Sequence, residues 1–219
     1  MLELGKLRGA LGAPAVPLSP QAAAALAVWQ ASPAEDEGKP HFAVRYVSLD
    51  IATTGLRPGQ DRLTALAAVG IRQGAISGDD AAAYDLPGSG SESLDVAEHL
   101  AGFLAYLGKG PLLTYQAAFV DAFLRRAIGE HLGVDFSPQW IDLAWVLPEF
   151  FGQNASAATL DDWLAIFNIR LPGRREAMSD AVAVARLFLA AQAEATRRGI
   201  DTPKKLREIE SRRRWLGRA

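Results

Sequence analysis

The sequence of 219 residues contains no cysteine and only three histidines. Disulfide bonds and thiolate zinc sites are therefore excluded, and His41, His99 and His131 leave little for a histidine-based metal site. Long hydrophobic runs are absent too, because no stretch approaches the roughly 18 uninterrupted apolar residues of a membrane span. The first residues lack the charged-then-apolar order of a secretory signal. We expect a cytoplasmic chain without membrane contact.

The charge is nearly balanced, at a formal −2, so nothing in the total indicates a nucleic-acid partner. With 49% hydrophobic residues, a chain of this length can bury one sizeable core. We predict three parts: an alanine- and proline-rich arm (1–41) with a short helix from Pro20 to about Ala31, a main domain (42–199), and a basic C-terminal helix (200–219). Ser19 is the expected N-cap of the arm's helix.

The main domain is organised around an apolar run that starts at Tyr46 and contains one carboxylate, Asp50. Apolar residues on both faces predict a strand in the centre of an α/β sheet. Two antiparallel strands should follow, then helices alternating with one further strand, which gives an α/β fold with a mixed sheet. The predicted strands are Leu63–Ile71, Ala75–Leu86 and Pro111–Tyr115; the predicted helices are Glu92–Leu107, Ala117–His131, Ile141–Phe151, Leu160–Phe167, Ala177–Arg197 and Pro203–Leu216.

A buried carboxylate usually has a metal ion, a cation or N–H donors as its partner. Here Asp50-Ile51-Ala52-Thr53-Thr54-Gly55-Leu56 resembles the first motif of the DEDD 3'–5' exonucleases, Asp-x-Glu-Thr-Thr-Gly-Leu. The resemblance is to the histidine subclass (DEDDh), which includes proofreading subunits such as the epsilon subunit of DNA polymerase III. It implies a ribonuclease H-like fold. The second acidic position of the motif is Ala52.

Two later stretches resemble the other motifs of this family. Tyr115 to Leu124 aligns with His-Asn-x-x-Phe-Asp-x-x-Phe-Leu, which places Val120 at the metal-binding aspartate. Asp121 is one residue late, and about 100° of helical rotation should point it away from the site. Arg175 to Ala181 aligns with His-x-Ala-x-x-Asp-Ala, so that Asp180 is retained and Arg175 replaces the general-base histidine. Trp140-Ile141-Asp142-Leu143 resembles a helix opening whose aspartate is generally structural.

The resemblance implies catalysis by two divalent metal ions, but only two of its five functional positions keep their side chains. Asp50 and Asp180 are retained, whereas Ala52, Val120 and Arg175 are substituted. Two carboxylates can hold one weakly bound Mg²⁺ or Mn²⁺, and a site without any metal is the equal alternative. Arg175 cannot act as a base at neutral pH; it could pair with the two carboxylates or grip a phosphate.

The turn that contacts the terminal nucleotide in the family is intact. By resemblance, the substrate-binding positions are Thr53, Thr54, Gly55, Leu56, Gln116 and Phe119. We therefore expect an exonuclease-family domain that binds a nucleic-acid 3' end or a nucleotide and has impaired or lost hydrolysis, a degenerate active site. Whether it is still an enzyme stays open.

Two alternatives stand beside this interpretation. One is a protein-interaction module that binds no nucleic acid and uses the N-terminal arm or the basic C-terminal helix. The other is an active exonuclease with rearranged ligands, namely Asp50, Asp121, Asp180 and Glu176. The C-terminal helix itself has two interpretations: an electrostatic surface for nucleic acid or an acidic partner, or a solvated helix docked by apolar residues such as Leu206, Ile209 and Trp215.

Overall fold

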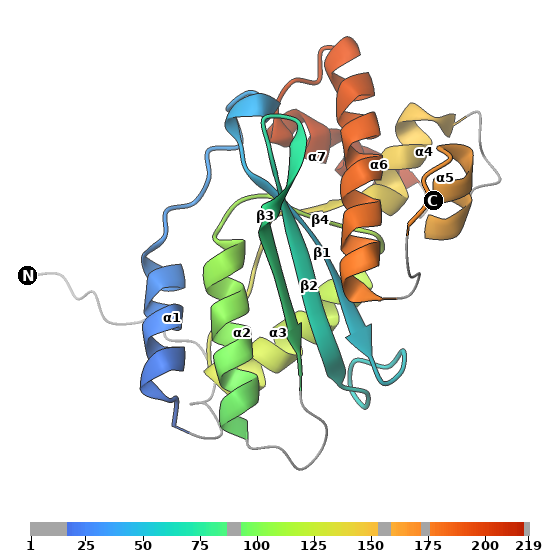
Figure 1. The fold of residues 1–219 in the computed structure, drawn as a ribbon. Helices are drawn as coiled ribbons and strands as arrows, with labels where there is room; N and C mark the ends of the chain where they lie inside the picture. Colours follow the sequence, from blue (N-terminus) through green and yellow to red (C-terminus); the bar gives the residue numbers. More distant parts are fainter. Residues whose placement is uncertain (1–16, 87–92, 153–158, 172–175, 217–219) are drawn as a thin grey trace, which may run out of the picture.

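The computed structural model describes residues 17–86, 93–152, 159–171 and 176–216. They form a five-stranded mixed sheet with helices on both faces (Figure 1). The α/β fold with an antiparallel meander and parallel strands, expected from the sequence, is confirmed.

The sheet has the strand order β3-β2-β1-β4-β5. β2 runs antiparallel to its two neighbours, β1 and β3, and β4 and β5 run parallel to β1. Their bounds are β1 Tyr46–Thr53, β2 Leu63–Arg72, β3 Ala75–Asp85, β4 Leu112–Thr114 and β5 Trp140–Asp142. Because β1 is paired on both sides, it is the central strand, as its apolar character predicts.

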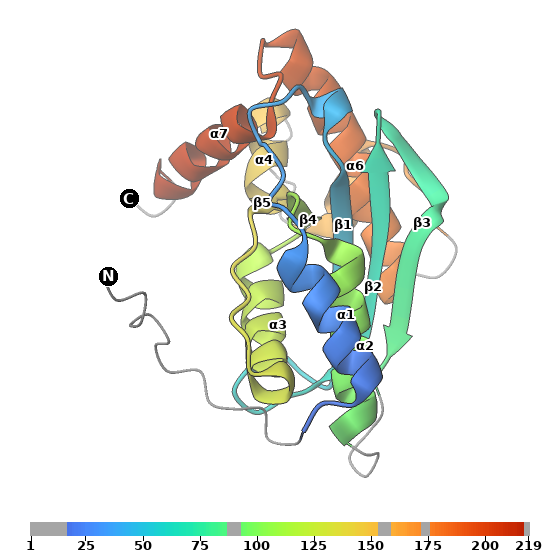
Figure 2. The ribbon, with the colours of Figure 1, turned by 90° about the vertical axis from the view of Figure 1, so that its left-hand side faces the viewer.

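The helices divide between the two faces of the sheet, with α1, α2 and α3 on one side and α4, α5 and α6 on the other (Figure 2). Their bounds are α1 Pro20–Ala31, α2 Ser93–Leu107, α3 Ala117–Leu132, α4 Leu143–Phe150, α5 Leu160–Ile166, α6 Ala177–Arg197 and α7 Pro203–Leu216, with a 3₁₀ turn, η1, at His41–Ala43. No helix in the described ranges combines the length and the apolar character needed to cross a membrane.

Alternation along β1 assigns each of its side chains to one of two cores. Val47, Leu49 and Ile51 pack with α2 and α3. Tyr46 packs on the opposite side against Phe188 of α6, with ring centroids 4.6 Å apart. Since successive strand residues point to opposite faces, the even-numbered positions, including Asp50, belong to the α6 side.

One part of the element prediction was wrong. The helix expected from Ile141 begins at Leu143, because Ile141 and Asp142 belong to β5, where they pair with Leu113 and Thr114 of β4. A strand of three residues is too short to show alternation in the sequence. The start of the helix predicted from Glu92 lies outside the described residues, which enter α2 at Ser93.

The helix of the N-terminal arm packs on the main domain. Ser19 accepts a hydrogen bond from the Ala22 amide at 3.1 Å and so caps α1, as predicted. Ala22 and Leu26 are buried in the core that α1 shares with α2. The Trp29 indole donates to the Gly108 carbonyl at 3.1 Å, just beyond the end of α2. The sequence left open what this helix packs against, and the structure shows that it is α2.

Candidate nucleic-acid site

The two retained carboxylates lie at the junction of β1 and α6. Ser48, on the α6 face of β1, donates a hydrogen bond to the carbonyl of Ala181 at 2.7 Å, and both groups are buried. Asp50 follows on the same face one alternation later, and Asp180 directly precedes Ala181 in the first turn of α6. Figure 1 shows α6 beginning beside the end of β1. The fold therefore brings Asp50 and Asp180, 130 residues apart in the sequence, toward the same end of the sheet, where β1 has its carboxyl end.

Two of the three substituted positions carry no ligand atom. Ala52 is the next residue on the same face of β1, half-buried opposite Ala65 of β2. Val120 is 1% exposed and packs in the core formed by α2, α3 and β1. Arg175 lies outside the described residues, so its predicted pairing with the carboxylates stays a prediction.

Asp121 points away from the site, as its position on the helix predicts. One carboxylate oxygen accepts from the Trp140 indole at 2.7 Å, and the other accepts from Arg125 at 2.5 Å. The Trp140 bond ties α3 to β5, and the Arg125 bond lies within α3. Glu176, the fourth residue in the alternative ligand set, is the exposed N-cap residue of α6. Within the described ranges, no group of three or more His, Asp or Glu side chains is arranged to hold a metal ion.

The β1–β2 turn is closed by its own hydrogen bonds. The Thr53 hydroxyl donates to the Gly55 carbonyl at 2.7 Å, and Thr54 exchanges bonds with Arg62 across the turn at 2.9 and 3.0 Å. Leu56, at the tip of the turn, is 80% exposed. A turn held by its own bonds can present an apolar side chain to a ligand without first paying an ordering cost.

Two residues that the motifs did not indicate support this turn. Asp61 accepts from the Arg57 amide at 2.8 Å, and its carboxylate packs so closely on Gly55 that a Cβ there would lie 2.6 Å away. Arg126 of α3 donates to the carbonyls of Pro58 and Asp61 and so joins the turn to the helix that carries Phe119. The Asp61 contacts lie within the turn, whereas the Arg126 contacts come from a separate element, for which the local sequence gives no signal.

Asp142 positions the beginning of α3. Its two oxygens accept from the amides of Gln116 and Ala117, both at 2.9 Å, and one of them also caps α4 through Ala144 at 3.0 Å. Gln116 adopts a left-handed conformation with φ 64°, which starts the helix directly after β4. Burial raises the pKa of the Asp142 carboxyl, and the three backbone donors oppose that rise. The structural role implied for this aspartate is confirmed.

The predicted binding positions therefore gather at one end of the sheet, where β1 and β4 finish. β1 and β4 are parallel neighbours, so the turn after β1 and the start of α3 after β4 lie at the same, carboxyl, end. Gln116 is exposed there, and Phe119 is half-buried against Phe123, with ring centroids 5.0 Å apart. In open α/β sheets, ligands bind beyond the carboxyl ends of the strands.

The basic C-terminal helix is docked on the main domain, and much of its charge is paired. Leu206 is fully buried, which confirms docking by an apolar residue, whereas Trp215 is 71% exposed and does not contribute. The described pairs of its cations are Lys205 with Asp201, Arg207 with Glu37, Arg212 and Arg213 with Glu149, and Arg214 with Glu210. Paired cations attract a phosphate backbone less strongly than free ones do, so α7 is the weaker candidate for a nucleic-acid surface.

A buried acid on α7 lies against the residue that positions α3. Glu210 is 3% exposed, and both Arg214 and Asp142 act on it. Burial raises the pKa of the Glu210 carboxyl to about 7, although Arg214 favours the ionised form. Glu210 lies four residues after the buried Leu206, on the same face of the helix, whereas Glu208 is on the exposed face; this helical spacing is the signal that the sequence offers.

The arrangement of strands and helices is a ribonuclease H-like fold, and solved structures agree with it. E. coli exonuclease I in complex with a dT13 oligonucleotide superposes with a TM-score of 0.52 at 14% identity, over 70% of this chain and 42% of that one. Exonuclease X in complex with 5' overhanging duplex DNA superposes with a TM-score of 0.53 at 13% identity, over 76% of this chain and 98% of that one.

These similarities establish the fold that the motifs implied. The chain spans less than half the length of exonuclease I but nearly the whole length of exonuclease X. No family model matches the sequence, and no curated protein matches it.

Proposed function

We propose that this chain is an exonuclease-type domain that binds the 3' end of a single-stranded nucleic acid, or a nucleotide, with hydrolysis impaired or lost. The observation that carries the proposal is the contrast between the two halves of the site. The β1–β2 turn keeps its residues and its hydrogen bonds, whereas Ala52 and Val120 supply no oxygen where the motifs expect carboxylates. Exonuclease I, with the same fold, is solved with a single-stranded oligonucleotide.

The donor set fits one weakly held divalent cation and does not fit a pair. Mg²⁺ commonly uses one or two carboxylates together with water and phosphate oxygens. Asp50 and Asp180 could supply the carboxylates. A second ion needs further carboxylates, and Asp121 is occupied by Trp140 and Arg125. Loss of the general base alone lowers such a rate by about 10²–10⁴-fold.

Binding can be tested by fluorescence anisotropy with a 5'-labelled oligothymidylate and with its 3'-phosphorylated form, each with Mg²⁺ and with EDTA. We expect saturable binding that is weaker when the 3' end is blocked. Leu56→Ala should weaken it about tenfold, because a buried leucine contact contributes about 1.5 kcal/mol or more. Val28→Ala is the matched control, since Val28 is an exposed apolar residue on α1. Equal binding by Leu56→Ala and the parent chain would refute the assignment of the turn.

Hydrolysis is tested separately, by release of nucleotides from the same oligonucleotide with Mg²⁺ or Mn²⁺. We expect release at or near the background rate, and a gain with Ala52→Glu, which restores a carboxylate at a half-buried strand position. Metal-dependent hydrolysis by the parent chain at the rate of an ordinary nuclease would contradict the proposal. It would support the rearranged-ligand alternative instead.

A further inference from the structure

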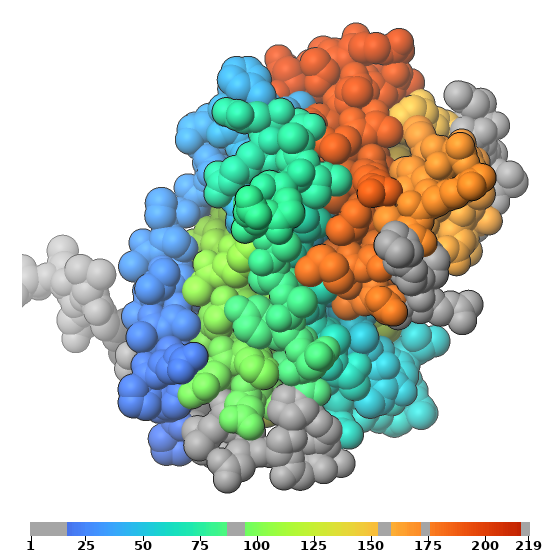
Figure 3. Space-filling view, viewed as in Figure 1, coloured from blue at the N-terminus to red at the C-terminus, as the bar shows by residue number. Residues whose placement is uncertain are grey.

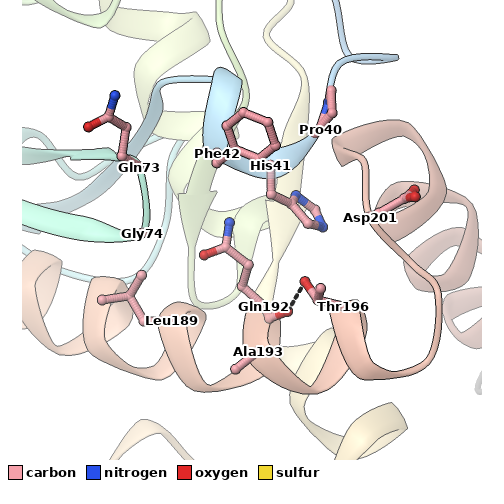
Figure 4. Close-up of a pocket in the computed structure, with 10 residues that line it drawn as sticks. All are labelled: Pro40, His41, Phe42, Gln73, Gly74, Leu189, Gln192, Ala193, Thr196 and Asp201. Carbon is pink, nitrogen blue, oxygen red and sulfur yellow. Dashed lines mark hydrogen bonds between the residues drawn. The ribbon is translucent and has the colours of Figure 1, made fainter.

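A concave site lies near the other end of α6, where Gln192 is about 18 Å along the helix from Asp180. It is a groove of about 710 Å³ between η1, the β2–β3 turn and the outer face of α6 (Figure 4). In the space-filling view these three segments meet at the upper edge of the molecule (Figure 3). The volume is in the range of ligand-binding clefts. The proposed nucleic-acid site uses none of its residues.

One polar side chain faces the groove and has no hydrogen-bond partner among the described residues. Gln192 is 9% exposed, and Figure 4 shows its carboxamide pointing toward Phe42, beside His41. Its main-chain carbonyl accepts from the Thr196 hydroxyl at 2.9 Å, whereas the described residues give the carboxamide no partner. The amide atoms are not among the fully buried side-chain atoms that lack a partner in the described residues, so they are open to the groove, where water or a ligand can bond them.

The neighbouring polar groups do not compete for that role. His41 uses both ring nitrogens inside the fold, with the Tyr46 hydroxyl at 2.5 Å and the Ile200 carbonyl at 3.1 Å. The carboxamide of Gln73 points away from the groove. Gln192 is thus the polar side chain that would give the site its directional contact.

The walls and the charge of the groove narrow the kind of ligand. Phe42 is 68% exposed and, with Pro40, Leu189 and Ala193, makes most of the lining apolar. None of the ten lining residues, all of them described, is Lys or Arg; Asp201 contributes a carboxylate, paired with Lys205 at 2.8 Å. A phosphate group would find no cation in this lining, which disfavours a nucleic-acid backbone or a phosphorylated metabolite.

We propose that this groove binds a short, uncharged or basic peptide segment of a partner protein. The peptide's main-chain N–H and C=O pair with the carboxamide of Gln192, and an apolar side chain packs on Phe42. In an extended peptide the N–H and C=O of one residue point to the same side, and together they offer the adjacent donor and acceptor that a glutamine amide matches. The proposal is independent of the nucleic-acid site, which lies at the opposite end of the sheet.

The test is an NMR titration of the full chain, labelled with ¹⁵N, with acetyl-leucyl-leucine methylamide. We expect saturable shifts of the Gln192 side-chain amide resonances. A peptide N-methylated at its central amide should bind about tenfold more weakly, because one hydrogen bond is lost. Uridine is the parallel probe for a nucleobase.

Variants then assign the contact to the residues named. Gln192→Leu and Phe42→Ala should each weaken peptide binding about tenfold, and Val28→Ala should leave it unchanged. Shifts that do not saturate, equal binding of the N-methylated peptide, or uridine binding that equals or exceeds the peptide's would each overturn the proposal. The N-methylated peptide tests it on the parent chain even if a variant fails to fold.

Discussion

Replacing Gly55 by alanine should destabilise the β1–β2 turn, and removing the Asp61 side chain should abolish that effect. A Cβ at position 55 would lie 2.6 Å from the Asp61 carboxylate, closer than side-chain atoms pack. Asp61 has a short side chain whose carboxylate accepts the Arg57 amide at 2.8 Å, so it can move only by breaking that bond. The backbone at Gly55 is not in the left-handed region, and so the conflict is one of space alone.

The expected magnitudes follow from that geometry. Gly55→Ala should cost about 1–3 kcal/mol, the usual range for an overpacked site. Asp61→Ala should cost about 1 kcal/mol, because it removes the acceptor of two exposed hydrogen bonds, a short one from the Arg57 amide and a long one from the Thr54 hydroxyl. With the carboxylate gone, the added methyl group has room, and Gly→Ala at a compatible position stabilises by about 0.4–1 kcal/mol through the unfolded chain. The double variant should therefore resemble Asp61→Ala or exceed it slightly in stability.

The assay is urea unfolding of the four chains, followed by tryptophan fluorescence, with thermal midpoints as a check. For a chain of this size, 1 kcal/mol corresponds to about 2–4 °C. Losses that simply add in the double variant would refute the steric explanation. The same four chains tested for oligonucleotide binding should rank in the order of their turn stability.

Three further changes test buried polar residues of the fold. Asp142→Ala removes the acceptor of three backbone donors and should cost about 3–5 kcal/mol by urea unfolding, with Asp135→Ala, an exposed position, as the control. Burial raises the pKa of Glu210 in the folded chain to about 7, above its ordinary value. The free energy of unfolding should therefore fall by up to roughly 3 kcal/mol as the pH rises from about 4.5 through 7. Glu210→Gln should remove that slope, and an unchanged profile would contradict the burial argument. Burial lowers the pKa of His41, whose neutral ring forms hydrogen bonds with the Tyr46 hydroxyl and the Ile200 carbonyl. The free energy of unfolding should therefore fall as the pH drops below about 6.5. A pH profile of His41→Gln as steep as that of the parent chain would count against this.

Local patterns in the sequence determined most of the elements. The apolar run of β1, the period of the helices and the Ser19-Pro20 start of α1 depend on neighbouring residues alone, and the structure contains them where they were predicted. The outward direction of Asp121 also followed from helical geometry, because one residue of offset rotates a side chain by about 100°. The motif positions carried enough information for the ribonuclease H-like fold.

Only the tertiary structure decided the contacts between distant segments. β5 becomes a strand because β4 is beside it, and Asp142 then serves α3 and α4 together. The arginines of α7 are basic in the sequence, but they lie opposite acids such as Glu149 once the helix docks. The groove around Gln192 is built from η1, a hairpin turn and α6, three segments that share no sequence signal. Such features depend on side chains that meet across the fold, and periodicity and motif spacing report only on neighbours along the chain.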